Sequence, residues 1–520
     1  MKLFKNGIIY TGDQITDHFV VDGKYFGQEA DQYDEVIDLK GKFVVPGFID
    51  SHMHLLNFGQ ALLEVQLQDH TSSLQEMKQA VKDYIIQNKV EKGKWVKGRG
   101  WNHDYFSDEN RFPDRYDLDE ISMDHPIMVT RCCGHISVVN SKALELIKMP
   151  ENYYLEDGQI DLDEKGKPTG VFRENAITLI EQAIPPVTKE EIKEMILTAS
   201  HELNHYGITS CHSDDFKVFP VDYKIVLAAF EELRNQLTVR VNEQSQLTKE
   251  ELKEFLANGY TTNVGDEIFK IGPLKMLGDG SLGAGTAYLK EPYEDAPAIR
   301  GIPIFTLEQF KEMIELAHSH HMAVAIHSIG DQTFENILTA YEYVINKYPD
   351  IQLRHGIIHC QITSNEQIKK FARLGLHAYI QSIFLDYDIH IVHKRVGKRA
   401  DESYGFTSYL KEGSHVSNGS DCPVELPDVL KGMQCAITRK TVCDHMGPYR
   451  IEEACDLSQA IASFTSEGAY ASYEEKIKGK IQKGMLADFV VLDKDLFKVV
   501  PDELSSVKIL ETYFNGEKVY

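Results

Sequence analysis

The sequence is poor in basic residues and contains no long apolar segment. It holds 55 Lys and Arg against 80 Asp and Glu over 520 residues, for a formal net charge of −25. Nucleic acids and anionic membrane surfaces bind positive patches, so neither is expected as a partner. No run approaches the roughly 18 apolar residues that suggest a membrane-spanning helix.

The first residues do not read as a secretory leader, and the cysteines form no paired motif. Its first residues, MKLFKNGIIYTGDQ, have no long apolar core and no small-residue cleavage site, and they predict a strand and a turn. The eight cysteines are scattered and form no CxxC pair, a pattern typical of reduced thiols. We therefore expect a cytoplasmic protein.

What the sequence does contain is a regular alternation of apolar strands and amphipathic helices in its middle part. This alternation predicts βαβ units and a parallel sheet, and eight strands are the number that closes a (β/α)8 TIM barrel. The predicted strands are 43–51, 208–214, 237–244, 269–277, 322–330, 356–362, 377–383 and 415–421, and helices are predicted at 306–320, 332–347 and 364–374.

Both ends of the chain and one long segment near its start fall outside this pattern. Residues 1–45 and 470–520 read as short strands with glycine turns, each too small for a core, so we expect them to pair into one β-sandwich. About 150 residues separate the first strand from the second, whereas a βαβ unit needs about 30. Residues 61–180 are therefore predicted to form an insertion over the barrel mouth, and 46–60 with 181–469 to form the barrel.

The first barrel strand lies in the stretch FVVPGFIDSHMHLL, where His52 and His54 are two residues apart. Alternate residues of a strand share a face, so the two imidazoles point the same way and can form half of a site for a divalent metal. The alternative is two polar residues at a strand end that bond to solvent or backbone.

Other predicted strands end in residues that could complete such a site. The C-terminal ends of the strands carry the chemistry of barrel enzymes, and here they add Lys275, His327, His359 and Asp421. Six ligands exceed the four of a tetrahedral zinc, which favours two ions. Zinc is the expected metal, although the same ligands hold other divalent ions.

Lys275 needs a separate explanation, because an ammonium group cannot bind a cation and is costly to bury. Either it pairs with Asp421 or Asp279 in a metal-free site, or CO2 converts it to a carbamate that bridges two metals about 3.5–4 Å apart. The neighbouring GDGSLG, residues 278–283, matches GxGxxG, but no amphipathic helix follows it. We therefore favour a glycine-rich loop at the barrel mouth over a dinucleotide site.

Several of these segments together resemble the amidohydrolase superfamily: PGFIDSHMH, KMLGDGSLG, VAIHSIGD, IIHCQ, NGSDCPV and GKIQKGMLADFVVLD. The resemblance is to the amidohydrolase 3 branch, the YtcJ-like proteins that include N-substituted formamide deformylases, and it spans nearly the whole chain. It implies a distorted (β/α)8 barrel with a β-sandwich from both termini. Ile358, where a Glu is expected, and Cys422 depart from the family pattern.

The resemblance also implies a metal arrangement and a reaction. One metal is held by His52, His54 and Asp421, the other by His327 and His359, with Lys275 bridging them as a carbamate. The implied reaction is hydrolysis of an amide-type, non-peptide C–N bond in a small-molecule substrate by a metal-activated hydroxide. Asp421 acts as general base and then as general acid.

The same metal pair serves other reactions, because fold and metal do not set the substrate. Hydrolysis of a cyclic amide, an ester or a deaminable C–N bond stays open, as does a catalytically silent regulatory relative, and so does assembly into a homo-oligomer. The candidates for the substrate cavity are Trp101, His103, His135, Asp279 and Ser281, with ordinary packing or turn bonding as the alternative for each.

Overall fold

The computed structural model describes all residues, 1–520, and the chain divides into two compact units. The first, called the barrel unit below, comprises Met1–Phe58 and Lys189–Tyr520. The second, called the inserted unit, comprises Gly59–Thr188. The helix α1 (Leu55–Leu62) carries the chain from one unit into the other.

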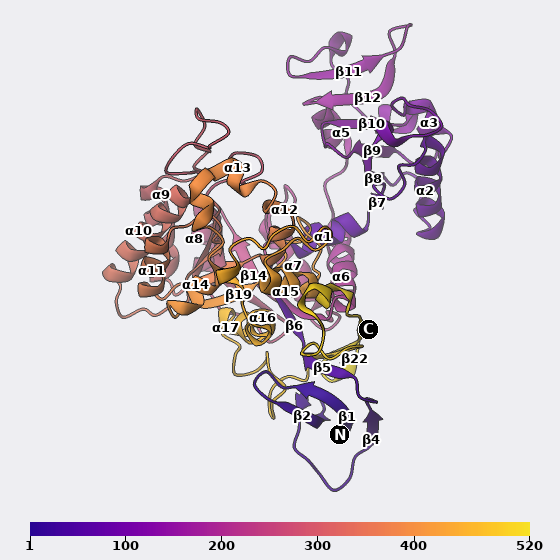
Figure 1. The fold of residues 1–520 in the computed structure, drawn as a ribbon. Helices are drawn as coiled ribbons and strands as arrows, with labels where there is room; N and C mark the ends of the chain where they lie inside the picture. Colours follow the sequence, from indigo (N-terminus) through magenta and orange to yellow (C-terminus); the bar gives the residue numbers. More distant parts are fainter. The chain divides into compact units, whose positions relative to one another are not determined.

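The core of the barrel unit is a parallel eight-stranded sheet that curls into a barrel (Figure 1). In spatial order its strands are β6 (Phe48–Met53), β13 (Ile208–Ser213), β14 (Arg240–Gln246), β15 (Phe269–Leu277), β16 (Val324–Ser328), β17 (Gly356–His359), β18 (His377–Ile380) and β19 (His415–Asn418). The predicted barrel of eight strands is confirmed. Nearly every residue of these strands is buried, which explains why they read as apolar runs rather than as alternating patterns.

Two backbone hydrogen bonds join the last strand to the first. The Asp421 N–H donates to the His52 carbonyl at 2.8 Å, and the His54 N–H donates to the Cys422 carbonyl at 2.8 Å. The bonds that close the barrel are therefore made by residues at the predicted metal site and their neighbour Cys422.

Helices follow the strands, and Figure 1 shows α9, α10 and α11 side by side on the outside of the barrel. Three helices of the barrel unit begin with capping boxes, in which the N-cap residues are Thr248, Thr306 and Ser364. The helices of this unit are α6 (Lys189–His205), α7 (Tyr223–Leu233), α8 (Lys249–Ala257), α9 (Leu307–Ser319), α10 (Asp331–Lys347), α11 (Asn365–Arg373), α12 (Leu385–Asp388), α13 (Val392–Val396), α14 (Phe406–Lys411), α15 (Val429–Thr438), α16 (Leu457–Ser463) and α17 (Ser466–Ala471).

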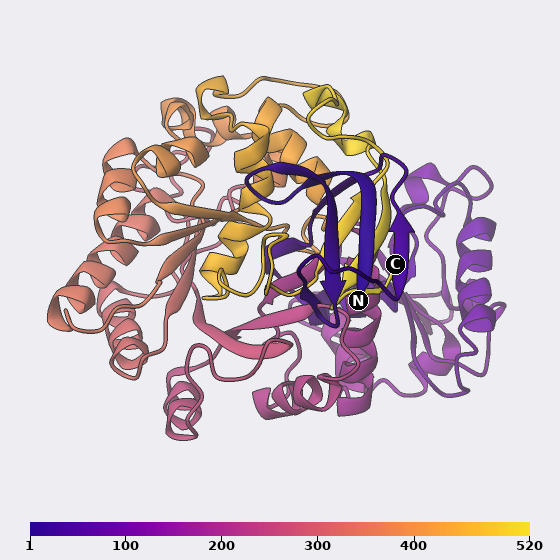
Figure 2. The same ribbon diagram turned by 90° about the horizontal axis from the view of Figure 1, so that it is seen from below.

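Both termini contribute to one further sheet of the barrel unit, as Figure 2 shows for the indigo and yellow strands. Its strands are β1 (Lys2–Tyr10), β2 (Ile15–Asp22), β3 (Tyr25–Phe26), β4 (Glu35–Asp38), β5 (Phe43–Pro46), β20 (Phe489–Leu492), β21 (Ile509–Phe514) and β22 (Glu517–Lys518). Its core packs Phe4, Phe19, Phe489 and Tyr513 ring against ring. The predicted pairing of the two ends of the chain is confirmed.

The predicted strand 43–51 is two strands that belong to different sheets. β5 pairs with β20 in the terminal sheet, and β6 pairs with β13 in the barrel. Gly47 lies between them, where a Cβ atom would come within 2.2 Å of the Thr209 hydroxyl. The chain thus passes from one sheet to the other at a point with no room for a side chain.

The inserted unit has a mixed sheet of its own with apolar clusters on both faces. Met128 and Val129, neighbours on one strand, belong to different clusters, as do Val138 and Val139. Its strands are β7 (Val65–Gln66), β8 (Val96–Trp101), β9 (Ile127–Arg131), β10 (Ile136–Val139), β11 (Gly158–Leu162) and β12 (Pro168–Glu174), and its helices are α2 (Leu74–Gln87), α3 (Arg115–Asp119), α4 (Ser141–Leu144) and α5 (Ile177–Ala183). No helix in either unit has the length and apolar character needed to cross a membrane.

Candidate metal centre

Histidines from three barrel strands gather with Asp421 at the C-terminal end of the barrel. The Nε2 atoms of His54 and His52 lie 3.1 Å and 3.3 Å from the same Asp421 oxygen, Oδ1. The ring of His359 is centred 5.8 Å from that of His52 and 4.4 Å from that of His327. The six predicted ligands thus form one connected group, with Lys275 joined to it through His52.

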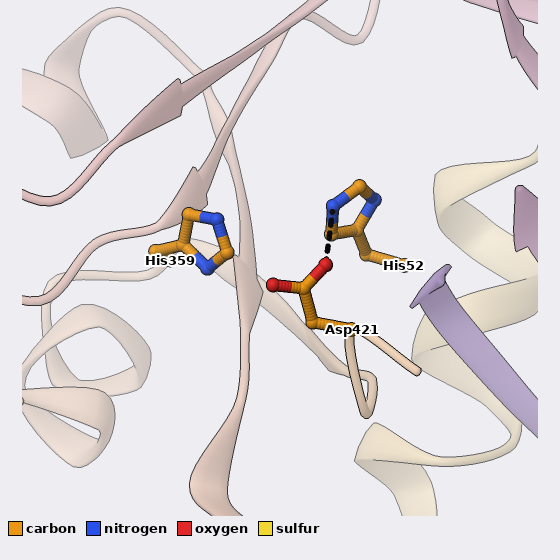
Figure 3. Close-up of side chains that lie close together, drawn as sticks. All are labelled: His52, His359 and Asp421. Carbon is orange, nitrogen blue, oxygen red and sulfur yellow. Dashed lines mark ion pairs between the residues drawn. The ribbon is translucent and has the colours of Figure 1, made fainter. Parts of the chain in front are cut away.

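One set of three ligand atoms that could hold an ion takes one histidine from each of the two expected metals. Donor atoms of His52, His359 and Asp421 all lie within 4.8 Å of one another, and all three residues are buried. In Figure 3 the Asp421 carboxylate lies between the two imidazole rings. How the ligands divide between two ions stays a prediction.

Two glutamine side chains determine which nitrogen of His52 and His359 faces this group. Gln244 Nε2 donates to the Ser51 carbonyl at 3.3 Å, and Gln381 Nε2 donates to the Tyr379 carbonyl at 3.3 Å. A carbonyl can only accept, so the amide oxygens must point the other way.

Those oxygens lie 2.6 Å from the Nδ1 atoms of His52 and His359, respectively. Each Nδ1 therefore carries the proton, and each Nε2 keeps a lone pair for the centre.

The other two histidines also have an oxygen beside Nδ1. His54 Nδ1 lies 2.9 Å from the Asp214 main-chain carbonyl, a hydrogen-bond distance, and His327 Nδ1 lies at an ion-pair distance of 3.2 Å from Asp279 Oδ1 without forming a hydrogen bond. In all four histidines, an oxygen beside Nδ1 favours the proton on that nitrogen. Metal-binding histidines in proteins are held in this way, so the donor set fits a divalent ion.

Burial and neighbouring charges shift the pKa values of these groups, downward in His52, His359 and Asp421 and upward in His54. Burial, together with the nearby Lys275 ammonium, lowers the pKa of His52 to about 4, and burial lowers the pKa of His359 well below its usual range. Burial also opposes charge on His54, but the Asp421 carboxylate raises the His54 pKa to about 9. Although burial favours the neutral acid, the paired histidines hold the pKa of Asp421 well below its usual range. A metal would take the place of the His54 proton.

Lys275 pairs with Asp214, a residue that the sequence did not suggest as its partner. Its Nζ lies 3.1 Å from Asp214 Oδ2 and 3.4 Å from His52 Nε2, and both the lysine and the aspartate are buried. Asp214 directly follows β13, so the rule of strand ends could have found it. Carboxylation of Lys275 stays a prediction.

Asp50 is a further residue that the sequence reasoning missed. Its carboxylate accepts hydrogen bonds from the N–H groups of His52 and Ser420 and from the Ser420 hydroxyl. It thereby holds the loop before Asp421 against β6. Burial raises the pKa of Asp50 to about 7.

His359 and Asp421 both have a left-handed backbone, with φ of 77° and 59°, a conformation that persists where the surroundings impose it.

The predicted substrate-binding residues lie in several settings. Trp101 is fully buried in a core cluster of the inserted unit, and His103 packs on Phe112 at 4.3 Å between ring centroids. His135 is exposed and pairs with Glu174 at 2.9 Å.

Two of these residues belong to the barrel unit. Ser281 is exposed in the glycine-rich loop, where its hydroxyl accepts a hydrogen bond from the Ala284 N–H. The Asp279 carboxylate is buried and hydrogen-bonded to the main chain. Substrate contacts of all five candidates stay predictions.

A parallel eight-stranded barrel with a histidine–aspartate group at its C-terminal end is the arrangement of a metal-dependent hydrolase. The chain matches the model of a family described as the amidohydrolase family over residues 35–520, and it belongs to that family. It is 33% identical to the putative amidohydrolase YtcJ of Bacillus subtilis (strain 168), over 100% of this chain and 99% of that protein.

Two further relatives support this membership. The N-substituted formamide deformylase of Arthrobacter pascens is 26% identical over 93% of this chain and 89% of its own length. The crystal structure of an uncharacterized metal-dependent hydrolase from Pyrococcus horikoshii OT3 superposes with a TM-score of 0.77 at 27% identity, covering 96% of this chain and 99% of that one.

Proposed function

We propose that this protein hydrolyses a non-peptide C–N bond of an amide in a small-molecule substrate, using divalent metal held at the end of the barrel. The observation that carries the proposal is the common orientation of four buried or half-buried histidines. Nδ1 lies within hydrogen-bond distance of an oxygen in His52, His54 and His359 and at ion-pair distance from a carboxylate in His327, which leaves Nε2 for a cation. The amide bond is proposed because one relative is named as a formamide deformylase.

In this proposal, His52, His54 and Asp421 hold one ion, His327 and His359 hold a second, and Lys275 bridges the two as a carbamate. Zinc is the ion we expect, because imidazole and carboxylate ligands suit it. When bound, such ions polarise a carbonyl group and lower the pKa of a coordinated water.

Asp421 is the acid–base residue of this proposal. Its carboxylate reaches the centre from the loop after β19, in contact with His52 and His54. It accepts the proton of the attacking water and returns that proton to the leaving amine. Gln244 and Gln381 keep two histidines in the required tautomer throughout.

The first part of the test is metal analysis of the purified protein. We expect one to two equivalents of a divalent ion. A folded protein with no metal at pH 7–8 and none after incubation with zinc would refute the proposal.

The second part is turnover of a panel of N-substituted formamides, longer amides, cyclic amides and esters. We expect hydrolysis of open-chain amides, lost by at least 10³-fold in Asp421→Asn and retained in Asp456→Asn, which removes only the cap of α16. Turnover of esters or cyclic amides alone would keep the metal site and replace the proposed bond class. A metal-loaded protein with no turnover of any panel member would favour the regulatory alternative.

A further inference from the structure

Asp279 lies in the glycine-rich loop after β15, and its buried carboxylate ties two segments together. Its Oδ1 accepts a hydrogen bond from the Ile329 N–H at 3.1 Å, and its Oδ2 accepts from Tyr288 at 2.9 Å and Gly330 at 2.8 Å. Tyr288 belongs to the long loop between β15 and α9, whereas Ile329 and Gly330 follow β16. One side chain thus holds this loop against the end of the strand that carries His327.

The same carboxylate faces His327. Oδ1 lies at an ion-pair distance of 3.2 Å from His327 Nδ1, and that buried nitrogen forms no hydrogen bond. The side chain of Asp279 is fully buried, at 0% exposure. The negative charge of the carboxylate favours the proton on the ring nitrogen beside it, Nδ1, and leaves Nε2 with its lone pair. The His327 ring is centred 4.4 Å from that of His359.

The main chain around this contact has no room for a side chain at two glycines. A Cβ atom on Gly330 would come within 2.2 Å of the Tyr288 carbonyl oxygen, and one on Gly278 within 2.4 Å of the His327 carbonyl oxygen. Gly278 and Gly330 thus let backbones touch where Asp279 binds them.

We propose that Asp279 is a positioning residue that couples the loop from Gly278 to Thr306 to the orientation of His327. The inference rests on the proposed function in that His327 is treated as a metal ligand. The loop leaves the C-terminal end of a barrel strand, where substrates bind in this fold. A change that disorders this loop therefore also weakens metal binding at His327, and a metal bound at His327 orders the loop.

The test is Asp279→Asn, which keeps the size of the side chain but replaces one oxygen by an NH2 group. Whichever oxygen is replaced, the new NH2 group faces a main-chain N–H donor instead of accepting from it. The negative charge beside His327 is also lost. Asp295→Asn is the matched control, because Asp295 lies in the same loop and pairs only with Arg395 at 3.2 Å.

Three readouts are compared with the wild type: metal stoichiometry and affinity by chelator competition, the absorption spectrum of the cobalt-loaded protein, and amide hydrogen exchange of residues 280–305. We expect Asp279→Asn to bind one ion about 10- to 100-fold more weakly, with an altered cobalt spectrum and faster exchange in the loop. Asp295→Asn should leave both metal readouts unchanged.

The inference is overturned if Asp279→Asn holds the same ions with unchanged affinity and spectrum, even when the loop exchanges faster, because Asp279 then serves the loop alone. A wild type that binds no metal refutes the proposed function instead. In that case a crystal structure of metal-free Asp279→Asn decides the inference. A displaced His327 ring together with a rearranged loop supports the coupling, and an unmoved ring rejects it.

Discussion

Two amide side chains, Gln244 and Gln381, select the tautomers of His52 and His359 at this centre. A neutral imidazole has one protonated nitrogen, and the wrong choice would present an N–H to the cation. The main-chain carbonyls of Ser51 and Tyr379 orient the two amides, and the amides select the tautomer. The choice is therefore built into the backbone of β6 and β18.

Removing one of these amides should weaken metal binding without unfolding the barrel. In Gln381→Leu the Nδ1–H of His359 loses its acceptor, at 2.6 Å in the wild type, and the ring is free to change tautomer or rotate. We expect metal affinity to fall by about 10- to 100-fold, measured by chelator competition.

Gln434→Leu is the control for the loss of a buried glutamine, since Gln434 accepts a hydrogen bond from Ser505 and contacts no histidine of the centre. Equal affinity losses in the two variants would contradict the tautomer argument.

The sequence supports prediction of ligands better than of the residues that orient them. His327 and His359 directly end apolar runs, and His52 follows one after Asp50 and Ser51, which is a local signal. Gln244 acts on a histidine 192 positions away, and Gln381 on one 22 positions away. Which side chains meet across strands depends on the register of the sheet, and no single stretch of sequence shows that register.

At the scale of elements, the position of Asp421 depends on how closely β19 approaches β6. Gly419 lies at this closure, where a Cβ atom would come within 2.6 Å of the His52 nitrogen and 2.7 Å of Asp50 Oδ1. The His52 nitrogen is part of the backbone and cannot move aside. The Asp50 oxygen is held by a hydrogen bond from the Ser420 N–H. A side chain at this position must push the two strands apart.

We therefore predict that Gly419→Ala costs about 1–3 kcal/mol of stability and lowers metal affinity at least tenfold. Gly413→Ala is the control: Gly413 has φ of 86° and open space around it, so alanine there adds backbone strain of about 1 kcal/mol. Urea unfolding and chelator competition separate the two effects. Metal loss in Gly413→Ala of the same size would show that stability alone controls binding.

The barrel strands could be predicted because strands buried on both faces are short apolar runs between helices. The predicted range 43–51 did not reveal the division into β5 and β6. Both pieces are apolar, and only the partner strands, β20 and β13, distinguish them. These partners lie more than 150 residues away in the chain, as the pairs Val45 with Val490 and Ile49 with Ser210 show.

A buried ion-pair network at the start of β15 makes the barrel unit sensitive to acid. Glu474 lies 2.7 Å from the Lys478 ammonium and 3.5 Å from that of Lys270. Burial acts to raise the pKa of Glu474, but these ammonium groups lower it from 4.5 to about 2. A lowered carboxyl pKa stabilises the fold above the unfolded value, and this contribution is lost as the pH falls from 4.5 toward 2.

We predict that Glu474→Gln is less stable than the wild type by about 3 kcal/mol at pH 6–7 and that this difference shrinks toward zero near pH 2. Lys270, whose pKa burial lowers to about 8, stays charged throughout this range. Urea unfolding at several pH values, taken as the difference between variant and wild type, removes the contribution of other carboxyl groups. A difference that is constant with pH would contradict the assignment.

At the scale of the whole molecule, the two units offer separate spectroscopic signals. The chain has two tryptophans, Trp95 and Trp101, and both belong to the inserted unit, where Trp101 is fully buried. The proposed metal ligands all belong to the barrel unit. Tryptophan fluorescence therefore follows the unfolding of one unit, while the proposed metal ligands belong to the other.

A bound metal stabilises only the state that binds it, by about 2.7 kcal/mol at 100 times the dissociation constant. Because the inserted unit has its own core on both faces of its sheet, we expect it to unfold as a separate transition. Zinc should raise the midpoint of the transition seen by circular dichroism and leave the tryptophan midpoint unchanged, with EDTA reversing the shift. If zinc moves both midpoints together, the units unfold as one and the free energy of metal binding is shared between them. If it moves only the tryptophan midpoint, the metal binds to the inserted unit, and the centre assigned to the barrel is wrong.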